Sequence, residues 1–233
     1  TFSPYGGNWS NFFTSSSYLT ITNASLGTMA NQPLTVEAWV NITATGAIVH
    51  EQYGPDSINF ALAVGYQIGD MLYTATPWFS YYNGSSWVAG VISSETLEFN
   101  KWYHVAGVFD GTTNKIYING VLRGTTANTS WITSAGTGVT IGGGDWQTTA
   151  PGYFSNIRIV KGTAVYTSNF TPPTSPLTPI TNTALLTCQS PRFIDTSTNA
   201  YAVTINGSPT VQRFSPFNPS SLTPTSYSGY FDG

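Results

Sequence analysis

The stretch around residues 83–84, an Asn-Gly pair, carries aromatic side chains at two-residue spacing. Asn-Gly is typical of a two-residue hairpin turn, which would place Tyr82 opposite Ser85. The residues that this hairpin would hold on one side are Trp78, Ser80, Tyr82, Ser85 and Trp87. Aromatic rings between small hydroxyl residues can stack on the apolar face of a sugar while the hydroxyls form hydrogen bonds. The pattern therefore predicts either a carbohydrate-binding platform or a buried face, which is the commoner fate of aromatic-rich strands.

A second candidate for sugar binding is Asp145-Trp146, which follows three consecutive glycines at residues 142–144. A tryptophan in a glycine-rich loop has no automatic place in a core, so we expect its ring to be available to a ligand. The glycines do not predict a phosphate site, because neither Lys-Ser/Thr nor a helical pattern follows them. The predicted carbohydrate-binding residues are thus Trp78, Tyr82, Trp87, Asp145 and Trp146.

Carboxylates do not occur in the pattern that glycan hydrolysis requires. That reaction uses two acids facing one cleft, which on a β-strand calls for i, i+2 spacing. Glu95 and Glu98 are three residues apart, and Glu37 has no acidic partner in its segment. His104 lies near no Ser or Cys nucleophile motif, which favours a structural role over that of a base. We therefore expect no catalytic residues and no enzyme activity.

The sequence does not indicate a metal or cofactor site. Cys188 is the single cysteine and there are only two histidines, so zinc has no set of soft ligands. Calcium would require clustered acidic side chains, whereas Asp110 belongs to an Asp-Gly turn. We expect no cofactor, and calcium is the alternative that this turn leaves open.

Composition restricts the classes of partner. The 233-residue chain has 7 basic and 10 acidic residues and a net charge of −3, which gives no basic surface for nucleic acid. No apolar run approaches the ~20 residues of a membrane span, so we expect no membrane insertion. Few charges among abundant Thr, Ser, Asn and Gly suit an extracellular or virion surface, and we expect the protein to act there.

β-Strand patterns run through most of the chain. In residues 34–42, LTVEAWVNI, every even position is apolar and three of the odd ones are polar, which predicts a half-buried antiparallel strand. Comparable patterns predict strands at 18–21, 59–64, 71–74, 78–82, 86–91, 103–109, 115–119, 138–141 and 155–160. Asn119-Gly120 predicts a tight hairpin turn. The predicted fold is all-β, a two-sheet antiparallel jelly-roll sandwich with no substantial helix.

Residues 97–126 carry the signature of a known family. They contain a Trp-Tyr-His-Val strand, an Asp-Gly turn and a Lys-Ile-Tyr-Ile-Asn-Gly hairpin, and this order resembles the laminin-G-like, concanavalin A-like lectin/glucanase module. The matching residues are Trp102, Tyr103, His104, Val105, Phe109, Asp110, Gly111, Lys115, Tyr117, Asn119 and Gly120. The resemblance covers roughly residues 15–170. It implies a β-sandwich but no single function, because such modules include lectins, adhesion modules, glycanases and spacers.

The two ends of the chain repeat each other. Phe-Ser-Pro-Tyr at residues 2–5 returns as Phe-Ser-Pro-Phe at 214–217, and Gly233 aligns with Ser15. A period of about 218 residues is typical of a tandem array, and residues 158–195 resemble repeats in marine bacteriophage virion structural proteins. The predicted organisation is a laminin-G-like sandwich at 1–170, a Pro-rich connector at 171–183, and the first strands of a following or permuted repeat at 184–233.

The strands expected within residues 184–213 must pair either with their own sandwich or with another copy, because both arrangements satisfy the same sheet edges. Pairing within one chain has the higher effective concentration and is favoured. Exchange with a neighbouring copy would instead build a filament.

Together these patterns predict a non-enzymatic structural or adhesion module of a repetitive phage virion appendage or cell-surface protein. One alternative is a lectin module for host-surface glycans, and another is a filament subunit that exchanges strands. The expected partners are other copies or neighbouring repeats of the protein, and surface glycans.

Overall fold

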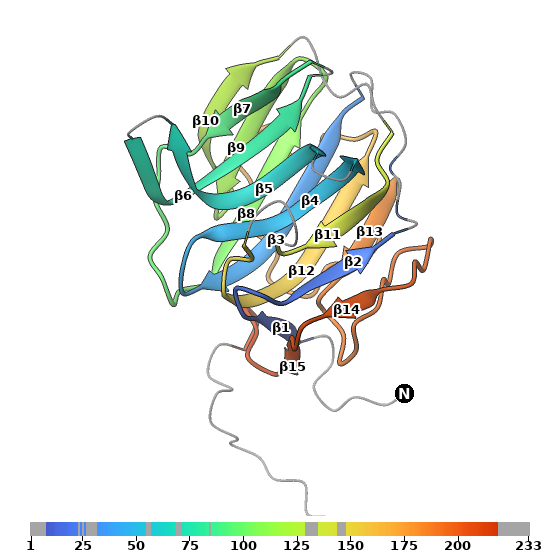
Figure 1. The fold of residues 1–233 in the computed structure, drawn as a ribbon. Helices are drawn as coiled ribbons and strands as arrows, with labels where there is room; N and C mark the ends of the chain where they lie inside the picture. Colours follow the sequence, from blue (N-terminus) through green and yellow to red (C-terminus); the bar gives the residue numbers. More distant parts are fainter. Residues whose placement is uncertain are drawn as a thin grey trace, which may run out of the picture.

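The computed structural model describes residues 8–22, 24, 26, 32–54, 57–68, 71–83, 85–128, 135–143 and 148–218. Within these residues the chain forms fifteen β-strands and no helix. The strands pair antiparallel in two sheets that pack face to face (Figure 1). This arrangement confirms the predicted all-β, two-sheet antiparallel sandwich.

The larger sheet has eight strands in the order β10-β9-β8-β3-β12-β1-β15, and β13 also pairs with β12. Its strands are β1 (Ser10–Phe13), β3 (Leu34–Ile42), β8 (Tyr103–Phe109), β9 (Thr113–Ile118), β10 (Val121–Ala127), β12 (Gly152–Lys161), β13 (Thr183–Thr187) and β15 (Thr210–Gln212). β1 pairs with the first residues of β12, and β13 pairs with the last residues of β12. The two short strands therefore share one edge of β12.

The smaller sheet has seven strands in the order β14-β2-β11-β4-β5-β6-β7. Its strands are β2 (Tyr18–Ile21), β4 (Gly46–Gly54), β5 (Ser57–Ile68), β6 (Met71–Tyr82), β7 (Trp87–Ile92), β11 (Gly138–Ile141) and β14 (Thr204–Asn206). Apolar side chains from both sheets form one buried core between them, in which Phe13 packs on Phe154 at a ring-centroid distance of 4.9 Å. Burial of this apolar surface is the main stabilising contribution to such a fold.

The prediction that β3 is half-buried is wrong, because both of its faces are covered. The outward-facing Thr35 and Glu37 are as inaccessible as the core residue Val36 between them. Thr35 Oγ1 donates to the carbonyl of Thr163 at 3.0 Å and accepts from the Val165 N–H at 2.9 Å. Residues that follow β12 therefore lie across the outer face of the larger sheet, a long-range packing that alternation within one strand cannot reveal.

The strands of the C-terminal part pair within the same chain. β14 adds to the outer edge of β2 and β15 to the outer edge of β1, so this part of the chain extends both sheets (Figure 1). Part of the predicted connector is also docked, since Leu177 N–H donates to Asn156 Oδ1 at 2.7 Å and Arg158 Nη1 to the Thr178 carbonyl at 3.1 Å. The division of the chain into repeats stays a prediction.

One of the two Asn-Gly turns forms as predicted and the other does not. Asn119 and Gly120 are the two residues between β9 and β10, with φ angles of 49° and 76°. At residues 83–86 the expected two-residue turn is replaced by a longer loop, because Tyr82 pairs with Trp87 and not with Ser85. The Asn83 side-chain oxygen accepts hydrogen bonds from two backbone N–H groups of this loop, at 2.9 and 2.8 Å. This side-chain cap stabilises the longer loop and shifts the register.

Candidate functional site

A cluster of buried ionisable groups lies on the outer face of the larger sheet. Glu37 Oε1 accepts a 2.8 Å hydrogen bond from Arg158 Nε. Glu37 Oε2 lies 2.9 Å from His104 Nε2 and accepts a 2.7 Å hydrogen bond from the Tyr166 hydroxyl. Burial acts to raise the pKa of Glu37, but His104 and Arg158 outweigh it and hold the pKa below its ordinary value. The partners of this carboxylate are a ring nitrogen, a guanidinium and a phenol.

His104 is enclosed by aromatic rings in the same cluster. Its ring centroid lies 5.3 Å from that of Trp39, 6.2 Å from Tyr166 and 5.7 Å from Phe170. The side chain is fully buried. This environment favours the structural role expected for His104.

Trp78, from the predicted carbohydrate-binding platform, is only 2% exposed. Its indole Nε1 donates a 2.8 Å hydrogen bond to the carbonyl of Gly65, and the ring packs with Ile58, Ala61 and Ala63. Of the two alternatives predicted for this face, the position of Trp78 supports the buried one.

The structure brings two of the other predicted binding residues together. Tyr82 is half-buried at the end of β6 and is the cross-strand partner of Trp87 at the start of β7. The side chain of Trp87, and the whole of Asp145 and Trp146, lie outside what the structure describes. Carbohydrate binding by these residues stays a prediction.

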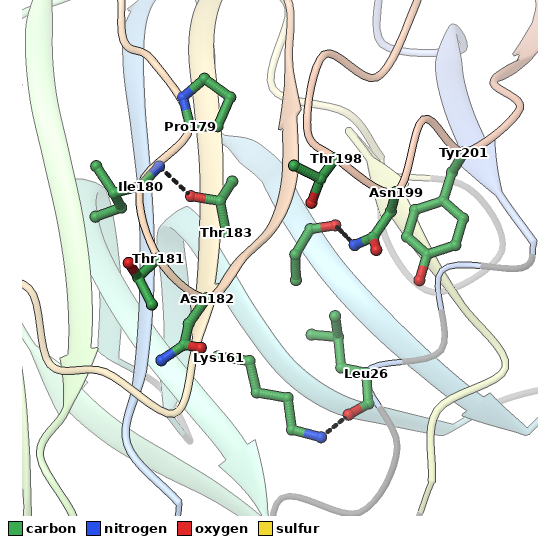
Figure 2. Close-up of a pocket in the computed structure, with 11 residues that line it drawn as sticks. Leu26, Lys161, Pro179, Ile180, Thr181, Asn182, Thr183, Thr198, Asn199 and Tyr201 are labelled. Carbon is green, nitrogen blue, oxygen red and sulfur yellow. Dashed lines mark hydrogen bonds between the residues drawn. The ribbon is translucent and has the colours of Figure 1, made fainter.

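A groove of about 690 Å³ lies where the C-terminal segment meets the end of β12. It is lined by Leu26, Lys161, Pro179, Ile180, Thr181, Asn182, Thr183, Ala184, Thr198, Asn199 and Tyr201. In Figure 2, residues 179–183 lie on one side and 198–201 on the other, with Lys161 and Leu26 between them. We call this hollow the seam groove. Its volume falls within the range of about 300–1,000 Å³ that is typical of small-molecule sites.

Lys161 and Leu26 form the base of the seam groove. The Lys161 Nζ donates a hydrogen bond to the Leu26 carbonyl, and the Leu26 N–H donates to Glu51 Oε1 at 2.9 Å. Glu51 is buried behind Leu26, where its other oxygen accepts from Asn59 Nδ2 at 2.9 Å. Burial raises the pKa of Glu51 to about 7, and the hydrogen bonds and the positive charge of Lys161 oppose this rise. The backbone of Leu26 is thus hydrogen-bonded to the Glu51 carboxyl through its N–H and to the Lys161 ammonium through its carbonyl.

The loop at residues 195–201 forms one side of the groove and is organised by the buried Asp195. Its Oδ1 accepts from the backbone N–H groups of Leu186 at 3.1 Å and Ser197 at 2.8 Å. Its Oδ2 accepts from the Ser197 hydroxyl at 2.8 Å and the Tyr201 N–H at 3.0 Å. The side chain of Asn199 also ties the loop to β13, since Nδ2 donates to the Ala184 carbonyl at 2.8 Å. These bonds fix Asn199 and Tyr201 against β13.

The groups that line the groove are suited to binding a polyhydroxylated ligand. Three threonine hydroxyls and two side-chain amides offer neutral donors and acceptors, and Tyr201 offers an aromatic ring. The oxygens of the Asn182 and Asn199 side chains form no hydrogen bond within the described residues. They are therefore available to accept hydrogen bonds from the hydroxyls of a ligand.

Sequence reasoning does not identify the residues of the seam groove. Lys161 and Tyr201 are far apart in the chain and meet only because β13 pairs with β12. The Asp195-Thr196-Ser197 sequence is a signal for a side-chain-capped turn, which marks an ordered loop but not a ligand site.

The described part of the chain contains neither a group of metal ligands nor a membrane-spanning helix. Among the described residues, no three His, Cys, Asp or Glu side chains gather in a way that could hold a metal ion. The same residues contain no helix that could cross a membrane.

The fold defines a lectin-type β-sandwich module. The chain belongs to the concanavalin A-like lectin/glucanase superfamily, because the family profile Laminin_G_3 matches residues 13–165, which is more than half of the sequence. The resemblance to the laminin-G-like module is thereby confirmed. No curated protein sequence matches the chain.

Solved structures with this fold come from bacteria and animals. A Bacteroides ovatus protein, designated a candidate carbohydrate-binding protein, has a TM-score of 0.58 and 18% identity over 88% of this chain and 59% of its own. The heptameric SAP-like pentraxin of Limulus polyphemus has a TM-score of 0.56 and 18% identity over 86% and 95% of the two chains. Domain 4 of the Geobacillus stearothermophilus arabinanase AbnA, solved with arabinotriose, has a TM-score of 0.50 and 20% identity over 67% and 72%. These likenesses establish the fold, and the chain spans 59% of the Bacteroides protein.

Proposed function

We propose that the protein is a non-enzymatic carbohydrate-binding module and that the seam groove is its binding site. The observation that carries this proposal is the lining of the groove, in which neutral hydroxyls and amides surround a space beside the Tyr201 ring. Such a surface matches the alternating hydroxyls and apolar faces of a sugar. The described residues that line it include no carboxylate to serve as a catalytic acid. The carbohydrate-related designations of the Bacteroides and Geobacillus structures are consistent with this proposal.

A glycan array followed by titration of a bound glycan tests this function. The variant Tyr201→Ala removes the aromatic ring from the groove, and we expect about a tenfold loss of affinity, the size of effect that aromatic stacking supports. Phe99→Ala is the matched control, because Phe99 is an exposed aromatic outside the groove. Failure of the wild type to bind any glycan, or equal affinity of wild type and Tyr201→Ala, would contradict the proposal. Loss of binding in Trp87→Ala or Trp146→Ala alone would move the site to the residues predicted from the sequence.

A second candidate function is structural, as a repeating unit of a phage virion appendage or a cell-surface protein. The repeated sequences at residues 2–5 and 214–217 and the edge positions of β14 and β15 favour it. In such an array the module would act outside the cell or on the virion surface, in contact with neighbouring repeats. The two functions are compatible, because adhesion to a surface glycan can be carried by a repeated unit.

A further inference from the structure

We propose that the seam groove selects acidic saccharides, and that the anionic group of the ligand, a carboxylate or a sulfate, pairs with the ammonium group of Lys161. This inference rests on the proposed function and specifies the class of glycan that the same groove binds. Three features of the groove lead to it: its charge, the position of the lysine, and the neutral groups on either side.

Among the described residues, one side chain supplies the charge of the groove. Lys161 is the single charged residue among the described residues that line it. The sequence on both sides of Leu26, NASLGTMAN at residues 23–31, contains no Asp, Glu, Lys or Arg. A lone cation among neutral groups attracts an anionic substituent and repels a cationic one. The groove is therefore expected to favour uronic acids or sulfated sugars over neutral sugars, and to disfavour amino sugars.

The lysine is positioned before a ligand arrives. It is the last residue of β12, where its backbone N–H donates to the Asn182 carbonyl at 3.1 Å. At the other end of the side chain, the Leu26 carbonyl accepts one of the three N–H groups of the ammonium. A side chain that leaves a fixed strand and whose ammonium is already hydrogen-bonded loses less conformational freedom when it binds, so more of the ion-pair energy appears as affinity.

The acid nearest to this lysine does not cancel its charge in the groove. Glu51 interacts with Lys161 electrostatically, but it lies behind Leu26 and is not part of the lining. The other groups that face its carboxyl are neutral, namely Asn59 and the Leu26 N–H. Burial raises the pKa of Glu51 to about 7, so its carboxyl carries little charge in mildly acidic solution. Lys161 then keeps its positive charge for a ligand.

The neutral groups make the site suitable for a saccharide and not merely for a small anion. Asn182 and Asn199 lie on opposite sides of the base formed by Lys161 and Leu26 (Figure 2). Each has a side-chain oxygen that forms no hydrogen bond within the described residues. A sugar ring between them can donate its hydroxyls to both oxygens while its acidic group reaches Lys161.

Calorimetric titration of the full chain with oligogalacturonate and with the same oligomer as its methyl ester tests the proposal, because the ester keeps the sugar and removes the charge. We expect the acid to bind about tenfold more tightly at about 50 mM salt, and this preference to shrink as salt screens the ion pair. A chondroitin sulfate oligosaccharide and its desulfated form are a second pair, which tells a sulfate from a carboxylate. A clear preference for the charged member of either pair supports the proposal.

Variants of the lysine show whether the preference comes from this site. Lys161→Gln should abolish the preference for the charged member of each pair, whereas Lys161→Arg should keep the preference because it keeps the charge. Lys101→Gln, at an exposed lysine outside the groove, is the control and should behave as wild type.

The two proposals fail in different ways. Equal binding of the charged and neutral members of both pairs would overturn acidic selectivity while leaving carbohydrate binding intact. An acidic preference that survives Lys161→Gln in a folded variant would overturn the role of Lys161. Absence of binding to every glycan on the array would overturn the proposed function itself.

Discussion

At the scale of single residues, the adjacent His50 and Glu51 of β4 respond to burial in opposite ways. They are 1% and 0% exposed. Burial lowers the pKa of His50 to about 4, and a hydrogen bond with the Gly142 backbone offsets part of this effect. Burial raises the pKa of Glu51 to about 7. Both side chains are therefore largely uncharged in the folded protein between about pH 4 and pH 7.

These two shifts affect stability with opposite signs. His50 takes up a proton more readily in the unfolded chain, so its contribution is lost as the pH falls from 6.5 to about 4. Glu51 holds its proton more tightly in the folded chain, so its contribution is lost as the pH rises from 4.5 to about 7. Each effect amounts to about 3 kcal/mol, and the two largely cancel between those ordinary values.

Substitution of one member of the pair should uncover the pH dependence of the other. In Glu51→Gln we expect the free energy of unfolding to rise by about 2 kcal/mol, relative to wild type, from pH 4.5 to pH 6.5, because only His50 then responds. In His50→Asn we expect it to fall over the same interval. Urea unfolding at a series of pH values measures these changes. If the free energy of unfolding depends on pH in the same way in wild type and both variants, the opposing contributions of His50 and Glu51 are ruled out.

Glu37 offers a second test at the residue scale. Glu37→Gln keeps the shape of the side chain but leaves the buried Arg158 guanidinium without its counter-charge. We expect a loss of about 3–5 kcal/mol in the free energy of unfolding, the usual effect of breaking a buried ion pair. Glu98→Gln, in the exposed pair with Lys101, is the control and should cause no measurable change. Wild-type stability of Glu37→Gln would show that the cluster contributes little.

At the scale of elements, the loop at residues 195–201 depends on one carboxylate. Asp195→Ala leaves the backbone N–H groups of Leu186, Ser197 and Tyr201 without their acceptor. We expect the free energy of unfolding to fall by about 2–4 kcal/mol. Glycan affinity should fall as well, because Asn199 and Tyr201 are no longer fixed. Urea unfolding measures the change in stability, and amide hydrogen exchange measures the loss of order in the loop. Unchanged exchange at residues 195–201 would refute this role of Asp195.

The elements that the sequence predicts best are those with an unbroken pattern. Residues 34–42 alternate and residues 103–109 are almost continuously apolar, and their predicted bounds equal those of β3 and β8. No sequence pattern predicts β4, because the buried His50-Glu51 pair interrupts the apolar residues of this strand. The predicted pairing of β6 with β7 is wrong, because their register depends on the side-chain cap formed by Asn83. The sequence of β3 also gives no sign that a distant segment covers its outer face.

At the scale of the whole molecule, the C-terminal strands decide how the chain assembles. β13, β14 and β15 all pair within the chain, and the Ser10 hydroxyl donates to the carbonyl of Phe214 near the two ends of the fold. We expect light scattering of the full chain to give the mass of one molecule at every concentration, because β15 and β14 of the same chain already pair with the edges of β1 and β2 that strands of another copy would take. A mass that rises with concentration would instead support strand exchange between copies.

The candidate site is a property of the whole molecule, and this is why the sequence did not predict it. The sequence could supply aromatic and hydroxyl residues that are neighbours in one hairpin, as around Tyr82 and Trp87. The seam groove cannot be predicted in this way, because it forms between the end of β12 and a loop that follows β13. A site assembled from distant segments becomes visible only once the pairing of those strands is known.

Whether glycans bind in the seam groove can be mapped by NMR, from the shifts of backbone amides when a glycan that binds is added. We expect the largest shifts at Lys161, at residues 180–184 and at residues 198–201, with little change elsewhere. Shifts that gather instead at residues 82–87 or 145–146, with the groove unchanged, would contradict binding in the seam groove.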